Sequence, residues 1–227
     1  MYSLKTKDLY DLSHTAAAAL LTEHEYPWRA LPHIKEYLIG LLSRLDSEEY
    51  YSPAPDVYIA KSARISPDAV ICGPALIGED TEIRTGAFIR GSAIIGRECV
   101  VGNSCEVKNS ILFDKVQTPH FNYIGDSILG YRAHTGAGAI TSNVKSDKSC
   151  IRVKTKHECI ETGLKKFGAM IGDGVEIGCN SVLNPGCVIG RNSTVYPLSN
   201  VRGCIPPNSI YKSNGAVIPK IFDDSEE

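Results

Sequence analysis

Aliphatic residues recur at every sixth position over a long stretch of this chain. The first run consists of Ile59, Ile65, Ile71, Ile77, Ile83, Ile89, Ile95, Val101 and Val107. The second consists of Ile171, Ile177, Leu183, Ile189, Val195 and Val201. A period of six fits neither an α-helix nor the simple alternation of a half-buried strand. It is typical of short strands joined by tight corners, three to a coil, and stacked into a parallel β-helix.

Small side chains accompany this rhythm, four residues after each aliphatic position of the first run until Ile111 breaks the rule. They include Ala69, Ala75 and Ala93, and the cysteines Cys99 and Cys105 fill the same place as small apolar residues. We expect the aliphatic column to fill the interior and the small column to occupy the crowded corners. A leucine at position 69 or 75 is therefore expected to overpack the coil.

The first 56 residues follow a different pattern and predict a helical cap and linker. Pro32 is expected in the first turn of a helix. Apolar residues then lie on one face of that helix, namely Ile34, Tyr37, Leu38, Leu41, Leu42 and Leu45. A shorter helix is expected in "SHTAAAALL", capped by Ser13. Because solenoids need covered ends, we expect these helices to cap a β-helix domain of residues 57–219. An acidic tail, 220–227, follows.

Two stretches depart from the six-residue spacing. The first, 112–123, brings His120, Asn122 and Tyr123 close together in sequence. The second, 142–170, is too long for a corner and alternates polar and apolar residues about "ETGLKK", which predicts a protruding hairpin. Long structured insertions in compact folds are usually functional. We expect the chain to leave the wall of the coil at these two stretches and to carry its chemistry there.

Composition and charge exclude several classes of partner. The chain has 24 Lys+Arg against 26 Asp+Glu, so no large basic field favours nucleic acid or an anionic membrane. No apolar run approaches the length of a spanning helix, and the start lacks the apolar core of a signal peptide. The eight cysteines include no C-x-x-C pair. We expect a cytoplasmic protein with structural thiols.

Three motifs in order carry a resemblance to a known family. They are "GNSCEVKNS" (102–110), "HFNYIGDSILG" (120–130) and "GAGAITSN" (136–143). Together they resemble the acetyltransferase domain of the bifunctional N-acetylglucosamine-1-phosphate uridyltransferase/glucosamine-1-phosphate acetyltransferase. The resemblance covers roughly residues 59–205 and implies a left-handed coil, a homotrimer and acetyl-CoA as co-substrate. The family's nucleotidyltransferase domain has no counterpart in this sequence, so we do not expect uridylyl transfer.

The resemblance also implies roles for individual residues. His120 matches the general base that removes a proton from the attacking sugar amine. Substrate-binding positions correspond to Arg84, Lys108, Tyr123 and His134, and coenzyme-binding positions to Asn143, Cys179 and Pro197. This chain has His134 where the family has an asparagine, and Val144 where it has a tyrosine after Asn143. The implied reaction is acetyl transfer to a phosphorylated or nucleotide-linked amino sugar.

The chemistry of such a reaction supports these residue types independently. An amine must lose a proton as it attacks a thioester, and histidine, with an unperturbed pKa of about 6.5, suits that task. Lys108 and Arg84 offer a point charge and a planar fork for an acceptor phosphate. Backbone N–H groups around "TGAGA" are candidates to stabilise the oxyanion. No nucleophilic cysteine is needed, which favours direct transfer.

Other interpretations remain open at the level of sequence. The basic insertion is either a solvated hairpin or a partner for the coenzyme's phosphates. A zinc enzyme of the γ-carbonic anhydrase type would use three histidines, for which His120, His134 and His157 are the candidates, although the paired H-x4-H spacing is missing. A third possibility is a non-catalytic module that binds a sugar nucleotide or a nucleotidyltransferase, since the tyrosine after Asn143 is absent.

Overall fold

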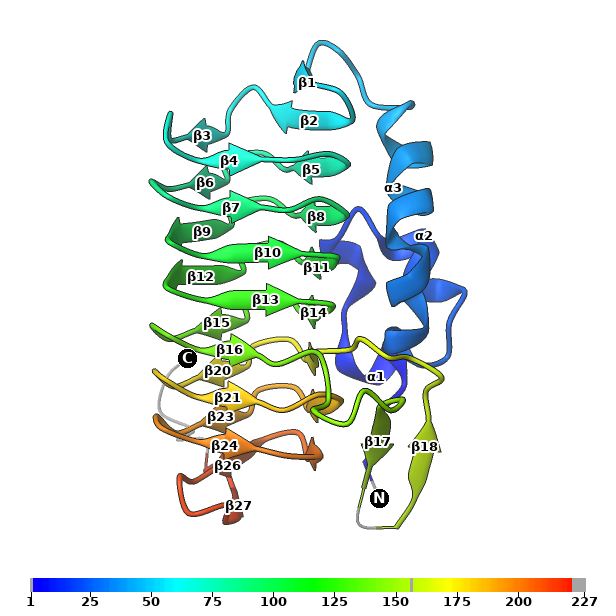
Figure 1. Ribbon diagram of the computed structural model, residues 1–227, viewed down its shortest axis with the longest axis vertical. Helices are drawn as coiled ribbons and strands as arrows, with labels where there is room; N and C mark the ends of the chain where they lie inside the picture. Colours follow the sequence, from blue (N-terminus) through cyan, green and yellow to red (C-terminus); the bar gives the residue numbers. More distant parts are fainter. Residues whose placement is uncertain (1, 156, 222–227) are drawn as a thin grey trace.

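The chain winds into a three-sided prism with a helical layer along one side (Figure 1). This computed structural model describes residues 2–155 and 157–221. Traced downwards in Figure 1, the chain crosses the front from left to right and returns behind, so the coil is left-handed. The predicted fold class, a mainly β left-handed parallel β-helix with N-terminal helices and a protruding hairpin, is confirmed.

Three sheets form the sides of the prism, and we call them A, B and C; their strands are parallel except for one edge strand in A and one in B. Sheet A contains β1 (Tyr50–Ala54), β2 (Val57–Ala60), β5 (Ala75–Ile77), β8 (Ala93–Ile95), β11 (Ser110–Leu112), β14 (Ile128–Leu129), β19 (Ala169–Ile171), β22 (Cys187–Ile189) and β25 (Cys204–Ile205). Sheet B contains β3 (Arg64–Ile65), β6 (Glu82–Ile83), β9 (Val100–Asn103), β12 (Gln117–His120), β15 (His134–Thr135), β20 (Glu176–Ile177), β23 (Thr194–Val195), β26 (Ser209–Tyr211) and β27 (Val217–Pro219). Sheet C contains β4 (Val70–Ile71), β7 (Phe88–Ile89), β10 (Glu106–Lys108), β13 (Tyr123–Gly125), β16 (Ile140–Thr141), β21 (Val182–Leu183) and β24 (Asn200–Val201). Each coil visits B, C and A in turn, which defines a B–C, a C–A and an A–B corner.

The six-residue spacing arises because equivalent residues of successive coils stack directly on one another. Ile77 pairs with Ile95 in sheet A, and Ile83 pairs with Val101 in sheet B. These inward side chains are buried, as are the small residues Ala75 and Ala93 at the corners. Burial at the small column also raises the pKa of Cys99 to about 12, which keeps that thiol protonated and unreactive.

Sheet A is apolar on both of its faces, which explains where the N-terminal helices lie. Its outward positions carry Leu76, Ile94, Ile111, Ile128, Met170 and Val188, all of them buried. The sequence signal is an apolar doublet in every third hexad, such as "LI" at 76–77 and "II" at 94–95. A strand that is apolar on both faces needs cover on both, and the helices supply it from outside.

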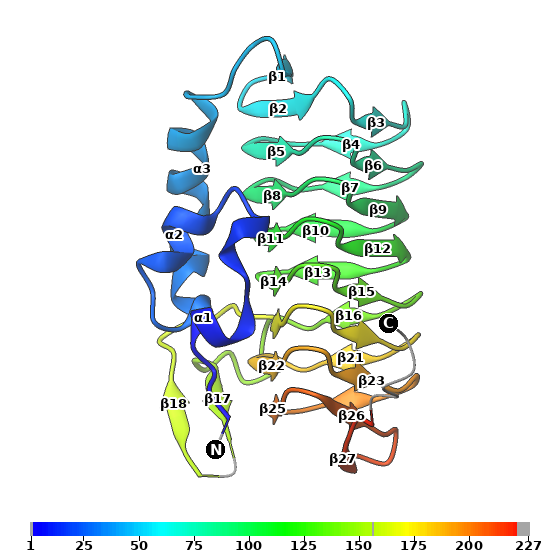
Figure 2. The ribbon, with the colours of Figure 1, turned by 180° about the vertical axis from the view of Figure 1, so that it is seen from behind.

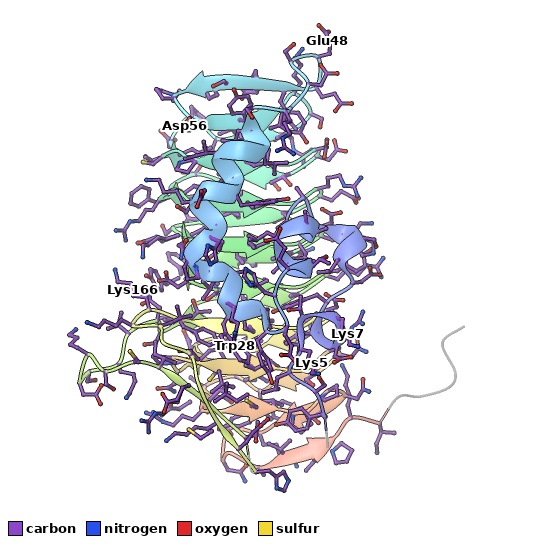
Figure 3. The ribbon with its side chains drawn as sticks, turned by 90° about the vertical axis from the view of Figure 1, so that its right-hand side faces the viewer. Lys5, Lys7, Trp28, Glu48, Asp56 and Lys166 are labelled. Carbon is purple, nitrogen blue, oxygen red and sulfur yellow. The ribbon has the colours of Figure 1, made fainter. Side chains whose placement is uncertain are left out.

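The helical layer consists of five short segments. They are α1 (Thr6–Leu9), η1 (Leu12–His14), α2 (Ala18–Thr22), η2 (Pro27–His33) and α3 (Ile34–Leu42). Helix α3 contacts β5 and β8 and buries Ile34, Leu38 and Leu42, the face that the sequence predicts. Figure 3 looks onto this layer, with sheet A behind it. The helices therefore cover one side of the prism and not its open end, where we had expected a cap.

Two finer expectations about these helices are also wrong. Ser13 does not cap a helix, because Asp11 Oδ1 accepts the hydrogen bond from the Ser13 N–H and begins η1. Pro32 lies inside η2 and does not start α3, which begins at Ile34. Backbone hydrogen bonds fix residues 9–14 to the A–B corner. The N–H of Asp114 donates to the His14 carbonyl, and the N–H of Asp173 donates to the Leu9 carbonyl.

Antiparallel strands interrupt the coil at both ends and within the insertion. Strand β1 pairs antiparallel with β2, and β27 pairs antiparallel with β26. The insertion forms a two-stranded hairpin of β17 (Arg152–Lys154) and β18 (Cys159–Glu161), which lies beside the lower coils in Figure 1 and, from behind, in Figure 2. Of the expected acidic tail, residues 222–227 lie outside the described residues.

The buried corner column leads to a stability prediction. Ala75 is fully buried, whereas Ala69 in the first coil is only partly buried. Replacing Ala75 with Leu is expected to lower the free energy of unfolding by about 1–3 kcal/mol, because the extra methyl groups have no space. Urea denaturation measures this, with Ala69→Leu as the matched control that is expected to cost less. An Ala75→Leu variant as stable as the parent would contradict the packing.

Candidate functional site

The loss of sixfold spacing near residue 112 has a precise structural origin at the C–A corner. Ile77 pairs with Ile95, 18 residues later, but Ile95 pairs with Leu112, 17 residues later, and Leu112 with Leu129, again 17. Two successive coils are thus one residue short. The winding itself continues, because β12 pairs with both β9 and β15. The expectation that the chain leaves the wall over 112–123 is therefore wrong.

The shortened corners hold Asn109 and Asp126, whose side chains meet. Asp126 is 3% exposed. Its Oδ1 accepts a hydrogen bond from Asn109 Nδ2 at 2.8 Å, and its Oδ2 accepts one from Asn143 Nδ2 at 2.5 Å. Lys108 Nζ lies 3.4 Å from Asp126 Oδ2. Residues from three successive coils therefore converge on one buried carboxylate, and we call Lys108, Asn109, Tyr123, Asp126 and Asn143 the corner cluster.

Tyr123 belongs to this cluster through its hydroxyl group. Asn143 Nδ2 donates to the Tyr123 hydroxyl oxygen at 3.2 Å. Burial raises the pKa of Tyr123, and the negative charges of Asp126 and Glu106 raise it further. The phenol therefore stays protonated at neutral pH and keeps its own proton to donate to a ligand oxygen.

The insertion begins and ends at the same cluster. The N–H of Phe167 donates to the Asn143 carbonyl at 3.0 Å, and the N–H of Gly168 donates to the Asp126 carbonyl at 2.8 Å. The buried Phe167 ring stacks against the buried Trp28 of the helical layer, with ring centroids 5.9 Å apart. Asn143 is thus held between the coil, the insertion and, through Phe167, the N-terminal segment.

His120 is the last residue of β12 and stands at the B–C corner, at the opposite edge of sheet C. Its side chain is exposed. Its N–H donates to Oδ1 of the buried Asn122 at 3.2 Å, and Asn122 Nδ2 donates to the Gly136 carbonyl at 2.8 Å. Gly102 makes this corner possible, because a Cβ there would lie 1.5 Å from the Pro119 carbonyl oxygen. The backbone at His120 is fixed while the imidazole is free to meet a ligand.

Arg84 and His134, two of the expected substrate-binding residues, lie on sheet B and away from the corner cluster. Arg84 pairs with Glu82 at 3.0 Å and lines an open cleft of about 560 Å³ together with Arg64 and Asn103. His134 Nδ1 lies 2.8 Å from Glu176 Oε2. Within a single chain, these residues do not share a sheet with Lys108 and Tyr123.

Arg90 is a candidate that the sequence reasoning missed. The pairing of β7 with β10 places Arg90 one coil before Lys108 in the same outward column of sheet C. Its Nη1 contacts Glu106 Oε1 at 2.5 Å, and its side chain is exposed. The sequence contains a signal for this, because Arg90 and Lys108 are separated by one full coil and so share a column. Arg84 lies outside that column, on sheet B.

The expected coenzyme-binding residues fall on two different corners. Asn143 lies at the C–A corner, whereas Cys179 and Pro197 are exposed in the B–C corner column below His120. The histidines of the zinc hypothesis are also separated: His134 is on sheet B and His157 is in the insertion. Among the described residues, no group of three His, Cys, Asp or Glu side chains is arranged to hold a metal ion.

Sheet C is therefore a surface with different chemistry at its two edges. The imidazole of His120 stands at one edge, and the cation and amides of the corner cluster stand at the other, separated by the three residues of β13, or about 10 Å of strand. A ligand lying across the sheet can meet a proton acceptor at one end and anion-binding groups at the other.

Comparison with known proteins agrees with this architecture. Residues 71–162 match the family model described as the GMPPB C-terminal domain, and residues 168–203 match the bacterial transferase hexapeptide model of six repeats. Bifunctional protein GlmU of Methanococcus maripaludis strain C7 is 35% identical over 112 residues, 49% of this chain and 27% of that protein. GlmU of Methanococcus vannielii is 30% identical over 164 residues, 72% of this chain and 34% of its own length.

Among solved structures, the acetyltransferase domain of PglB from Neisseria gonorrhoeae, in complex with acetyl coenzyme A, has 15% identity and a TM-score of 0.34, covering 71% of this chain and 56% of that one. The chain spans about a quarter to a third of the length of the curated relatives it matches. The fold and repeats define a hexapeptide-repeat β-helix protein. The expected resemblance to the acetyltransferase domain of GlmU is confirmed.

Within residues 2–155 and 157–221, no helix is long and apolar enough to span a membrane.

The corner cluster yields a prediction about Asp126. Its replacement with Asn removes the charge that faces Lys108 and turns one acceptor into a donor facing other donors. We expect the free energy of unfolding to fall by about 1–3 kcal/mol, as measured by urea denaturation. Asp147→Asn is the matched control, because Asp147 is exposed and its ion pair with Lys145 is worth little. Equal stability of the two variants would show that the Asp126 contacts are not needed.

Proposed function

We propose that this protein transfers an acetyl group from acetyl-CoA to the amino group of a phosphorylated or nucleotide-linked amino sugar. The observation that carries the proposal is the position of His120 at one edge of sheet C and of the corner cluster at the opposite edge. The similarity of this chain to part of GlmU supports it. The solved PglB domain, by its description, binds acetyl coenzyme A, which suggests the same donor here. Transfer is direct, and the cytoplasm is its expected location.

His120 acts as the general base in this proposal. As the acceptor nitrogen attacks the thioester carbonyl, the imidazole takes its proton. The C–S bond of the tetrahedral intermediate then breaks, and the imidazolium returns the proton to the departing sulfur, so coenzyme A leaves as the thiol. General bases of this kind accelerate reactions by about 10²–10⁴-fold. The exposed ring on a fixed backbone supports this role, because it is reachable and in a defined place.

The anionic part of the acceptor binds at the other edge of sheet C. Lys108 and Arg90 supply positive charge in one column, and the Tyr123 hydroxyl supplies a hydrogen-bond donor that Asn143 holds in place. Asp126 does not contact the acceptor but holds Lys108 and Asn143 in position. Rigid placement matters because binding groups that are already ordered lose little entropy when the ligand arrives.

A homotrimer with its sites at the subunit boundaries explains the remaining residues. Arg84 and His134 on sheet B face away from the corner cluster of their own chain, but neighbouring prisms placed side by side bring sheet B of one copy near sheet C of another. Exposed apolar side chains on sheet C support such a contact, namely Val70, Phe88 and Ile140. Cys179 and Pro197 then border the same boundary from the B–C corner.

Replacing His120 with Ala tests the mechanism. We expect kcat/KM to fall by about 10²–10⁴-fold while the oligomeric state, measured by light scattering, stays unchanged. Activity is followed as thiol release from acetyl-CoA with a panel of amino-sugar 1-phosphates and nucleotide-linked amino sugars. His157→Ala is the control, since His157 is exposed in the insertion and is expected to have no effect.

Two results would count against this proposal. Full activity of the His120→Ala variant would remove the assigned base. A parent protein that neither turns over the panel nor binds acetyl-CoA in calorimetry would favour the non-catalytic, sugar-nucleotide-binding module.

The two arginines can be told apart by the same assay. Arg90→Gln is expected to raise KM for a phosphorylated acceptor by about tenfold, the loss typical of a hydrogen bond between charged groups. Arg84→Gln is expected to have a smaller effect, because Arg84 lies on sheet B, outside the outward column that Arg90 shares with Lys108 on sheet C. The reverse order would restore the assignment of Arg84 as the phosphate ligand.

A further inference from the structure

The hairpin insertion is anchored firmly to the prism at its first strand. Along β17 the exposed Arg152 and Lys154 alternate with Val153, which is fully buried, as is Ile151 just before the strand. Strand β18 pairs with β17 from Lys154↔Cys159 to Arg152↔Glu161. The charged residues of β17 therefore project from a strand whose other face is packed against the protein, and their backbone is held in place.

Two glycines of the lower coils allow the hairpin to approach the wall closely. A Cβ at Gly186 would lie 2.7 Å from Ile151 Cγ2 and 3.1 Å from the Arg152 carbonyl oxygen. A Cβ at Gly203 would lie 3.1 Å from the Lys154 carbonyl oxygen. Both glycines also have positive φ, +83° and +77°. Larger residues at these corners would push the hairpin outwards.

A cleft of about 260 Å³ lies between the hairpin and these coils. Its lining includes Lys145, Arg152, Lys154, Arg202, Asn184 and Gly186. Four of these residues are cations, and among the described residues no acidic one lines the cleft. We call this space the hairpin cleft.

Nearby carboxylates balance only part of this charge. Arg152 Nε contacts Glu161 Oε1 at 2.7 Å, and Lys145 Nζ contacts Asp147 Oδ2 at 3.2 Å. Within residues 2–155 and 157–221, neither Lys154 nor Arg202 has an ion-pair partner. Like charges gathered around one space repel each other, and an anion bound between them removes that repulsion.

We infer that the hairpin cleft binds the phosphate groups of a larger ligand. Guanidinium and ammonium groups from two separate elements, the insertion and the coil, surround the space, and arginine suits phosphate because its planar fork donates two parallel hydrogen bonds. The volume is smaller than that of a typical site for a whole organic ligand, about 300–1,000 Å³. It suits a pyrophosphate or phosphomonoester, with the rest of the ligand outside.

The cleft lies next to the proposed reaction site along the same corner of the prism. Thr141 pairs with Leu183, so Asn184 of the cleft follows one coil below Ser142, beside the cluster residue Asn143. One coil corresponds to about 4.8 Å. A ligand that reaches from sheet C down the C–A corner therefore meets the cleft with its phosphates. This inference rests on the proposed function only for the source of those phosphates, either the coenzyme or a nucleotide-linked acceptor.

Calorimetry with inorganic pyrophosphate, coenzyme A and UDP tests the inference directly. The variant is Arg152→Gln/Lys154→Gln, which alters two exposed side chains and is expected to keep the fold. Lys165→Gln/Lys166→Gln is the matched control, because it removes the same charge from the same insertion at residues that do not line the cleft; Lys166 projects outwards in Figure 3.

We expect the parent protein to bind pyrophosphate and the first double variant to bind it at least about tenfold more weakly, with the control unchanged. If coenzyme A weakens in parallel and UDP does not, the coenzyme supplies the phosphates. If UDP weakens and coenzyme A does not, the acceptor supplies them. Absence of pyrophosphate binding by the parent, or equal affinity of both double variants, overturns the inference.

The binding measurement also separates this inference from the proposed function. It needs no turnover, so it gives a result with the His120→Ala variant and with a protein that proves inactive. Pyrophosphate binding that is lost in Arg152→Gln/Lys154→Gln, in a protein without acetyl transfer, would support the cleft and refute the transferase.

Discussion

Each coil of this protein must lie directly on the coil before it, and the rest of the structure depends on that constraint. Strands about 4.8 Å apart pair through their backbones, so residues one coil apart are forced into columns. An aliphatic column fills the interior, and a small column turns the corners. The same constraint stacks polar residues, which is how Lys108, Asp126 and Asn143, from three successive coils, come to touch.

The corner cluster shows how a small change in coil length brings polar side chains into contact. Loss of one residue at two successive C–A corners brings Asn109 and Asp126 together and leaves a buried carboxylate. A buried carboxylate is tolerated only where donors satisfy it, and here amides and an ammonium do so. The side chains that stabilise Asp126 are then held rigidly at the edge of sheet C. The insertion starts and returns at this same point.

The outer faces of the three sheets differ in chemistry, and each has a different role. Sheet A is apolar outside and takes the helical layer, sheet B remains open with Arg84 and His134, and sheet C carries the candidate site. The apolar doublets of sheet A are visible in the sequence and mark a side of the prism that needs cover, whereas the prediction of a cap at the open end rests only on the general need of solenoids for covered ends. Arg90 was likewise visible one coil from Lys108, but only the observed register assigns it to the same column.

The sequence by itself determined the stacking of short strands into coils, the interior residues, the hairpin and the presence of helices, because each of these follows from a periodicity within short stretches of chain. Only the tertiary structure decided which residues share a face. That assignment depends on the exact length of every coil, and one missing residue at a corner moves all later positions relative to the earlier ones. Polar inner residues such as Thr118 and Thr135 conceal this shift in the sequence, while backbone pairing between coils reveals it.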